Sequence, residues 1–174
     1  MLDGKVCVVT GGASGIGRAV ALAWARDGAR VIVSDLGSAA QGGEETAALA
    51  REAGAQAAFV AADVPREGDC AALVGRTLER FGRLDAACNN AGVGGAIVPL
   101  ADYASDEWHR VLSVNLTGVF LCMKHQIPAL IAAGGGAIVN VASILGAGGL
   151  PGTPGDTPAK PRGPRVAEVA PPGH

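Results

Sequence analysis

The amino-acid sequence predicts an α/β fold with a doubly wound parallel sheet, and three observations support this prediction. Five short apolar runs alternate with four segments of helical periodicity. The apolar runs are rich in Val, Ile and Ala and show little polar alternation, which is typical of parallel strands covered on both faces. Glycine or a polar residue follows most of these segments. Because strand–helix–strand crossovers are almost always right-handed, such repeats build an open sheet between two layers of helices.

Each predicted strand is a short run that ends in a residue typical of a turn. The runs comprise residues 5–10, 30–34, 57–62, 84–88 and 137–141. Gly11 and Gly12 follow the first run, whereas Asp35, Asp63 and Asn89 follow the next three. In a parallel sheet these positions share the carboxyl edge, which is where ligands bind in open α/β folds.

Helical periodicity predicts four helices between the strands, at residues 15–27, 44–53, 69–81 and 105–133. Gly28, Gly54 and Gly82 follow the first three and are expected to end them. Ser105 is expected to cap the fourth, which carries acidic residues in its first turn. Pro128 is expected to bend that helix near its end.

The regular pattern stops near residue 150. Residues 151–174 contain seven of the ten prolines and show no apolar period, which predicts a Pro/Gly-rich disordered tail. Residues 1–150 are therefore expected to form a single domain, and its sheet is expected to be incomplete on the C-terminal side. The fifth strand would then be an exposed edge.

Composition excludes several classes of protein. Of the 174 residues, 49% are hydrophobic and 17% are charged, and the formal net charge is −2. This balance lacks the basic surface of a nucleic-acid-binding protein. Glycine and proline interrupt each apolar stretch before it reaches the ~20 residues of a membrane span. The N-terminus lacks the basic region of a signal peptide, so we expect no membrane partner and a cytoplasmic location.

The cysteines do not show a metal-binding pattern. Cys122 and His125 are three residues apart, but no second pair of ligands completes a zinc site. Cys7 and Cys88 lie within predicted strands, and Cys70 stands alone in a predicted helix. We expect all four thiols to be buried hydrophobic groups in a reducing compartment, and we expect no metal.

A glycine motif lies between the first strand and the first helix, in the segment Thr10-Gly-Gly-Ala-Ser-Gly-Ile-Gly17. Gly11 permits a tight turn, Gly15 permits backbone to approach a pyrophosphate, and Gly17 permits close packing of helix on strand. The helix N-terminus offers free N–H groups to phosphates. A plain glycine turn is the alternative, but the position between strand and helix favours a dinucleotide site.

Asp35 closes the second strand, 18 residues after Gly17. Dinucleotide-binding sites place an acidic residue about 20 residues beyond the glycines, where it accepts hydrogen bonds from the adenosine ribose. Its charge repels a 2′-phosphate, so the sequence favours NAD over NADP. A turn Asp that caps the next segment is the alternative.

Taken together, several spaced motifs resemble those of the short-chain dehydrogenase/reductase family. They are the glycine motif, Asp63-Val64, Asn89-Asn90-Ala91-Gly92, Asn115 and Asn140-Val-Ala-Ser143. The resemblance covers residues 1 to about 154 and is closest to members that prefer NAD. It implies a Rossmann fold, NAD as cofactor, and hydride transfer between NAD(H) and a small alcohol or ketone.

The resemblance also assigns roles to individual residues. It implies a cofactor site made of Gly11, Ser14, Gly15, Ile16, Gly17, Asp35, Asp63, Val64, Asn90, Ala91 and Gly92. It implies two catalytic residues: Asn115, which would hold a water in a proton relay, and Ser143, which would hydrogen-bond the substrate oxygen. The alternatives are a helix Asn on a wet face and an ordinary loop Ser.

The family's acid/base pair is a Tyr followed four residues later by a Lys, and this sequence departs from it. The corresponding positions hold Asp156 and Lys160. An Asp with a pKa near ~4 has no proton to donate at neutral pH. Pro158 and Pro161 prevent the ordinary helix that would bring the pair together. Tyr103, the single tyrosine, precedes the fourth helix and does not correspond to the acid/base.

We therefore expect hydride transfer by this chain to be impaired or absent. The alternatives are an NAD-binding fragment without turnover and a non-functional frameshift product. Pro, Gly, Ala and Arg are encoded by GC-rich codons, so a shifted frame near codon 154 would produce such a tail. Family members usually form homotetramers through helices that include the one at 105–133, and we expect that assembly to be lost here.

Overall fold

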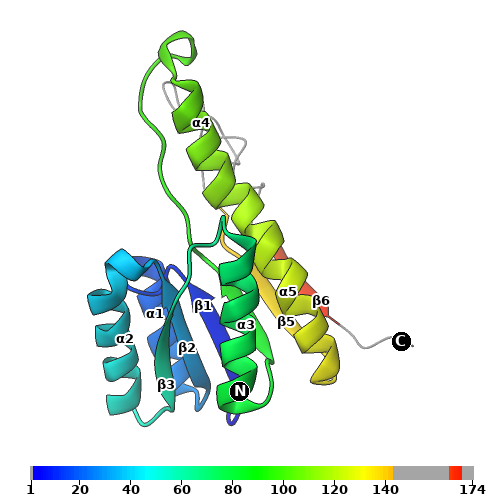
Figure 1. Ribbon diagram of the computed structural model, residues 1–174. Helices are drawn as coiled ribbons and strands as arrows, with labels where there is room; N and C mark the ends of the chain where they lie inside the picture. Colours follow the sequence, from blue (N-terminus) through cyan, green and yellow to red (C-terminus); the bar gives the residue numbers. More distant parts are fainter. Residues whose placement is uncertain (1, 143–164, 170–174) are drawn as a thin grey trace.

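The structure is a computed structural model that describes residues 2–142 and 165–169, the latter through their backbone. Its centre is a sheet with the strand order β3-β2-β1-β4-β5-β6 (Figure 1). The strands are β1 (Val6–Thr10), β2 (Arg30–Asp35), β3 (Ala57–Ala61), β4 (Ala86–Asn89), β5 (Gly136–Asn140) and β6 (Arg165–Val169). The first five are parallel, and the chain reverses its direction across the sheet between β3 and β4.

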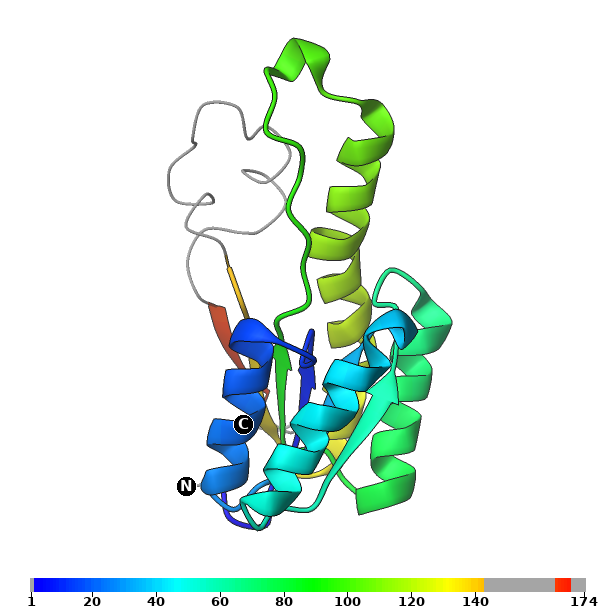
Figure 2. The same ribbon diagram turned by 90° about the vertical axis from the view of Figure 1, so that its left-hand side faces the viewer.

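Helices cover both faces of the sheet (Figures 1 and 2). They are α1 (Gly15–Arg26), α2 (Ala40–Glu52), α3 (Glu67–Phe81), α4 (Ser105–Leu112) and α5 (Gly118–Ala132), with short turns η1 (Gly37–Ala39) and η2 (Leu100–Asp102) and a π-helical turn η3 (Ser113–Thr117). One face carries α1 and α2, and the other carries α3 and α5. The segment before α4 and α4 itself project beyond the sheet (Figure 2).

The core has two layers because each central strand is buried on both sides. Cys7 and Val31 face a cluster with the alanines of α1 and α2. Val8 and Ile32, their neighbours in the sequence, face a second cluster with α3 and α5. Since both faces are apolar, the strands need no polar alternation, which confirms the prediction of a parallel sheet covered by helices.

The helical segments differ from the prediction in three places. Helix α2 begins at Ala40 rather than at residue 44, because Gly43 lets the helix pack flat on the ring of Phe59. Ser105 does not cap α4: the cap position is Ala104, and no side chain there accepts a backbone hydrogen bond. The segment predicted as one helix at 105–133 is interrupted by η3, and Pro128 lies inside α5.

The strand β6 lies in the part of the chain predicted to be a disordered tail. It pairs antiparallel with β5, from Gly136 opposite Val169 to Asn140 opposite Arg165. Residues 165–169 are a proline-free stretch between Pro164 and Pro171, so each can offer the backbone groups that a sheet edge requires. The edge of β5, which we expected to be exposed, is therefore paired. Residues 143–164 lie outside the described residues, and the domain division stays a prediction.

Candidate nucleotide-binding site

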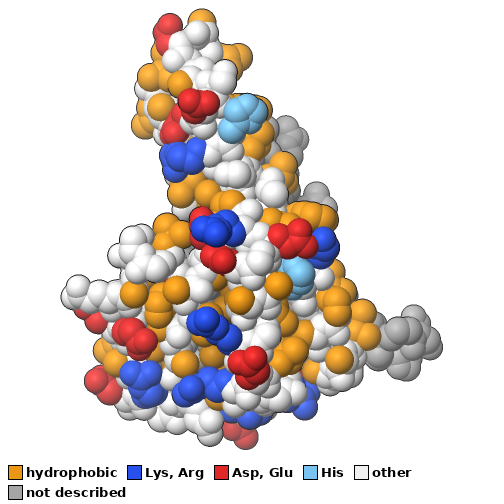
Figure 3. Space-filling model, viewed as in Figure 1, with side chains coloured by type: hydrophobic (Ala, Val, Ile, Leu, Met, Phe, Trp, Pro, Cys, Tyr) orange, Lys and Arg blue, Asp and Glu red, His pale blue; other side chains and the backbone are white. Residues whose placement is uncertain are grey.

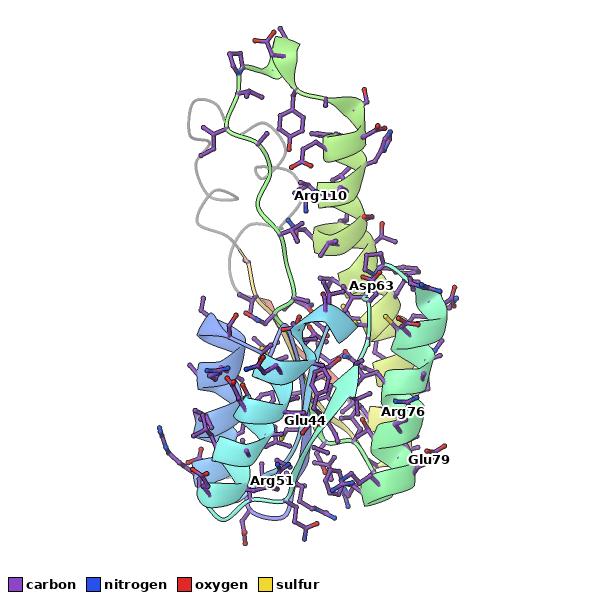
Figure 4. The ribbon with its side chains drawn as sticks, turned by 60° about the vertical axis from the view of Figure 1, so that its left-hand side comes forward. Glu44, Arg51, Asp63, Arg76, Glu79 and Arg110 are labelled. Carbon is purple, nitrogen blue, oxygen red and sulfur yellow. The ribbon has the colours of Figure 1, made fainter. Side chains whose placement is uncertain are left out.

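A cavity of about 370 Å³ opens at the carboxyl edge of the sheet, above β1, β2 and β4. This volume lies within the range of small-molecule sites. The cavity is lined by ten of the eleven residues predicted to bind the cofactor: Gly11, Ser14, Gly15, Ile16, Asp35, Asp63, Val64, Asn90, Ala91 and Gly92. In Figure 4, Asp63 lies after β3, at the base of the projecting helix.

The glycine loop has the backbone shape that its sequence predicts. Gly11 has φ 65° and Gly15 has φ 51°, values in the left-handed region that favours glycine. Gly17 does not line the cavity, but a Cβ there would overlap the carbonyl oxygen of Gly11 and lie 2.6 Å from Nδ2 of Asn90. The third glycine therefore sets the close approach of α1 to β1.

The N-terminus of α1 lies at the cavity, which Ser14, Gly15 and Ile16 help to line. Ser14 is its cap residue, and the Ser14 side chain accepts no capping hydrogen bond. Ile16 in the first turn is 64% exposed, so its apolar side chain is accessible beside the cavity. The first turn carries no acidic residue, so its N–H groups remain suited to an anionic group.

Asp35 joins this loop to the end of β2. Its Oδ2 accepts a hydrogen bond from the backbone N–H of Ala13 at 2.9 Å. Its Oδ1 accepts one from the backbone N–H of Leu36 at 2.8 Å. The carboxylate thus lies at the cavity wall and also fixes the shape of the glycine loop.

Arg18 holds the glycine loop in place through hydrogen bonds, a role that was not predicted from the sequence. Its Nη2 donates to the carbonyl oxygens of Ala13 at 2.6 Å and of Gly42 at 3.1 Å. Its Nε donates to Oγ1 of Thr46 at 2.8 Å. Because Thr46 and Gly42 belong to α2, the guanidinium ties the loop to the neighbouring helix. A local pattern could not reveal a partner 28 residues away.

The side chains of Asn89 and Asn90 form hydrogen bonds with neighbouring elements. Nδ2 of Asn90 donates to the carbonyl oxygens of Thr10 and Gly11, both at 3.1 Å. Asn89 and Gln126 exchange amide hydrogen bonds of 3.1 and 2.9 Å, although both side chains are buried. Since buried amides are costly unless satisfied, these contacts stabilise the end of β4 and its attachment to β1 and α5.

Asn115 lies in the π-helical turn and contacts the backbone of the loop after β4. Its Oδ1 accepts from the N–H of Val93, and its Nδ2 donates to the carbonyl oxygen of Val93, both at 2.9 Å. The side chain is 3% exposed. The amide therefore holds the 90–93 segment against the helix, and its predicted part in a proton relay stays a prediction.

The other residues predicted for catalysis are placed differently. Ser143, Asp156 and Lys160 lie outside the described residues. Tyr103 is half-buried with its hydroxyl against Gly95, and it does not line the cavity. The expectation that Tyr103 does not replace the family's acid/base stays a prediction.

Further residues line the cavity without having been predicted: Thr10, Ser34, Leu36, Ala62, Val93 and Val114. Ser34 is notable because its Oγ is buried and has no hydrogen-bond partner in the described residues. It directly precedes Asp35 at the end of β2, so the strand-end rule that identified Asp35 could also have identified Ser34. Among the described residues, no group of three His, Cys, Asp or Glu side chains could hold a metal ion, and no helix could cross a membrane.

Comparisons with known proteins agree with this geometry. The chain matches the family described as short chain dehydrogenase over residues 5–160. It is 46% identical over 145 residues to a cis-4-hydroxycyclohexanecarboxylate dehydrogenase of Sinomonas cyclohexanicum, which covers 83% of this chain and 57% of that protein. It is 44% identical over 151 residues to a 2,5-dichloro-2,5-cyclohexadiene-1,4-diol dehydrogenase of Sphingobium indicum, which covers 86% and 58%.

Solved structures show the same fold. A crystal structure of NAD⁺-bound xylitol dehydrogenase superposes with a TM-score of 0.87 at 36% identity, covering 91% of this chain and 60% of that one. The fold prediction, a doubly wound Rossmann sheet, is therefore confirmed. The chain spans less than two thirds of the length of these relatives. With the matching family and the shared motifs, the chain belongs to the short chain dehydrogenase family.

Proposed function

We infer that the cavity binds NAD(H), and that the whole protein uses it for hydride transfer with a small alcohol or ketone. One observation carries the choice of NAD over NADP. The described residues that line the cavity include Asp35 and Asp63 but no Lys or Arg. A 2′-phosphate would meet carboxylate charge without a cation to neutralise it.

The residues present fit a dinucleotide in three ways. The close packing at Gly17 leaves the α1 N-terminus directed at the cavity for a pyrophosphate. Oγ of Ser34 is a buried polar atom with no hydrogen-bond partner among the described residues, and it lies on the wall where Asp35 would accept ribose hydroxyls. Val64 and Val114 give that wall an apolar surface suited to an adenine ring. Arg18, the nearest guanidinium to the loop, is already bound to Ala13, Gly42 and Thr46.

NAD(H) supplies the hydride donor or acceptor, and the chain must bind it, orient it and move a proton at the substrate oxygen. The described residues provide the first two functions. Proton transfer at the substrate oxygen is the third function, and here the sequence has Asp156 where the family has Tyr. A carboxylate carries no proton that it could donate at neutral pH. We therefore expect binding to be retained and turnover to be strongly reduced.

A direct binding experiment tests this proposal. The purified chain is titrated with NAD and with NADP by isothermal calorimetry, at constant salt. We expect NAD to bind at least roughly tenfold more tightly, since an unpaired phosphate beside a carboxylate costs more than ~1.4 kcal/mol. Asp35→Ala should reduce this preference. Equal affinity for both nucleotides would contradict the choice of NAD, and binding of neither would contradict the nucleotide site.

A second candidate function is nucleotide binding without any turnover, and the Asp at 156 favours it. Cyclohexanol is a suitable first substrate, because relatives of this chain include a cyclohexanol dehydrogenase of Acinetobacter. Under this alternative the chain binds NAD but produces no substrate-dependent NADH absorbance. If it reduces NAD at a rate typical of dehydrogenases, the alternative is wrong, and so is the expected loss of turnover.

A further inference from the structure

Two cysteines face each other beneath the nucleotide cavity. Cys70 on α3 and Cys122 on α5 have their Sγ atoms 3.7 Å apart. Their residues are only 1% and 3% exposed. The two helices lie side by side on one face of the sheet (Figure 1). All four cysteines are free thiols, and none of them takes part in the proposed nucleotide contacts.

The hydrogen bonds of this pair distinguish the two sulfur atoms. The Cys70 thiol donates to the carbonyl oxygen of Val64 at 3.3 Å, so its single hydrogen is occupied. The Cys122 thiol is therefore the donor between the two sulfurs. This hydrogen bond lowers the pKa of Cys70, and the same bond together with burial raises the pKa of Cys122. Cys70 is thus the sulfur that ionises first.

The pair is in direct contact with the cavity wall. Val64, which lines the cavity, packs in one apolar cluster with both cysteines and Leu121. Helix α5 approaches Val64 closely, because a Cβ on Gly118 would lie 2.7 Å from Cγ2 of Val64. Ala91 and Val114, which also line the cavity, pack against the same cluster. A change at the sulfurs therefore reaches the cavity wall directly.

We propose that Cys70 and Cys122 are an oxidation site, which hydrogen peroxide converts into a disulfide that joins α3 to α5 and weakens nucleotide binding. Burial favours a small oxidant, because a bulky disulfide such as oxidised glutathione cannot reach either sulfur without opening the helices. Metal binding is a poorer use of the pair, since no third ligand completes a site among the described residues.

The reaction proceeds in two balanced steps. The Cys70 thiolate attacks one peroxide oxygen, the O–O bond breaks, and the released hydroxide takes a proton to become water. The Cys122 sulfur then attacks the resulting sulfenic sulfur, the S–O bond breaks, and a second water leaves with the Cys122 proton. Two thiols and one hydrogen peroxide thus give one disulfide and two waters. The thiols lose two electrons to the peroxide.

Closing the bond alters the wall of the cavity. A disulfide bond is about 2.05 Å long, so the sulfurs must approach by roughly 1.6 Å from their separation of 3.7 Å. A disulfide has no S–H group, so the carbonyl oxygen of Val64 loses its donor. Both effects displace the Val64 segment, and we expect the dissociation constant for NAD to rise roughly threefold or more.

Peptide mapping of the unaltered full chain tests the site itself. Trypsin places each cysteine on a separate peptide, namely 6–18, 67–76, 84–110 and 111–124. The folded chain is treated with hydrogen peroxide, its remaining thiols are alkylated, and the digest is analysed by mass spectrometry. We expect peptides 67–76 and 111–124 to be linked and the other two to be alkylated. Equal oxidation of all four cysteines, or none linked, would overturn the proposal.

Matched variants separate the pair from general thiol oxidation. Cys122→Ala and Cys70→Ala should each abolish the linked peptide, whereas Cys7→Ala, a buried strand cysteine, should leave it unchanged. The linked peptide in the unaltered chain stands as the first readout even if a variant folds poorly. A link that persists in Cys122→Ala would show that another thiol is the partner.

The effect on binding rests on the proposed function and is measured separately. NAD is titrated into reduced, peroxide-treated and re-reduced chain. We expect weaker binding after oxidation, recovery after reduction, and no change in Cys122→Ala. An unchanged affinity in a fully linked chain would overturn the coupling. If the reduced chain binds no NAD, the proposed function fails, while the linked peptide still decides the oxidation site.

Discussion

Gly17 packs so closely against the Gly11 backbone that adding a single methyl group at position 17 should disturb the nucleotide site. In Gly17→Ala the new Cβ would overlap the Gly11 carbonyl oxygen and lie 2.6 Å from Nδ2 of Asn90. The first neighbour is backbone, and Asn90 is held by two hydrogen bonds, so neither can move freely. Gly75→Ala is a matched control, because Gly75 also lies within a helix but has open space around its Cβ position.

The two substitutions are expected to change the free energy of unfolding in opposite directions. Alanine in place of glycine stabilises a helix by about 1 kcal/mol. At Gly75 nothing opposes this gain, so the free energy of unfolding should rise by about 0.5–1 kcal/mol. At Gly17 overpacking costs about 1–3 kcal/mol and should outweigh the gain. Since 1 kcal/mol shifts the Tm of such a chain by about 2–4 °C, the two variants should differ by several degrees.

Thermal melts followed by far-UV circular dichroism measure the difference, and calorimetric titration with NAD measures the site. We expect Gly17→Ala to bind NAD at least roughly tenfold more weakly, because displacing Gly11 moves the loop that faces the pyrophosphate. Gly75→Ala should bind normally. Should Gly17→Ala be as stable as the unaltered chain and bind NAD equally well, the close approach of α1 and β1 would not shape the site as described.

Three further predictions follow from contacts around the sheet. Burial raises the pKa of Asp85, but hydrogen bonds from Arg83, the Val6 backbone and Lys5 outweigh it and hold that pKa below its usual value. The contribution of the Asp85 carboxylate to the free energy of unfolding is therefore complete above pH ~4 and is lost as the pH falls through the lower folded pKa. In urea titrations the unaltered chain should thus lose stability more steeply with falling pH than Asp85→Asn does. Asn115→Ala leaves both backbone groups of Val93 unpaired and should cost about 1–3 kcal/mol in the same titrations. Arg18→Lys should weaken NAD binding in calorimetry, because one ammonium cannot replace the planar contacts to the loop and α2.

The assembly of the chain can also be assessed from its surface. Four large apolar side chains are exposed in and next to the projecting segment: Ile97, Leu100, Leu116 and Phe120. Figure 3 shows hydrophobic side chains on the surface of this part of the molecule. These residues lie in or beside the segment that family resemblance assigns to the tetramer interface. We expect sedimentation to show a heterogeneous chain rather than a uniform tetramer, because exposed apolar patches of this kind favour irregular association. A well-behaved tetramer would contradict this expectation.

Most of the fold could be predicted because its determinants are local. The apolar strands, the glycines after helices and the polar residues at strand ends are all legible over a few positions. The start of α2 could not be predicted in this way, because residues 37–43, which precede Glu44, end in two glycines and include no large apolar residue. Glycine is required at position 43 because the ring of Phe59, in the next strand, occupies the space that a Cβ would fill.

The site was predicted where it depends on motifs and missed where it depends on packing. Figure 4 shows Arg110 on α4 facing the projecting segment, and its Nη2 donates to the Gly94 carbonyl oxygen at 2.8 Å. That contact, like Arg18 with Thr46 or Cys70 with Cys122, joins residues 16 to 52 positions apart. A single sequence carries no local pattern for such pairs, whereas strand order alone brings Gly11, Asp35 and Asn90 together.

Asp35 has one role that its sequence motif predicts and another that only the packing of the structure reveals. Its position after β2 predicts contact with a ribose, yet in the structure its two oxygens already accept hydrogen bonds from Ala13 and Leu36. Each carboxylate oxygen has a second lone pair, so it can hold the loop and still accept a ribose hydroxyl. Removing the charge to admit NADP would therefore also release the glycine loop. A change of cofactor preference in this chain needs a substitution that restores the acceptor for Ala13 as well as one that adds a cation.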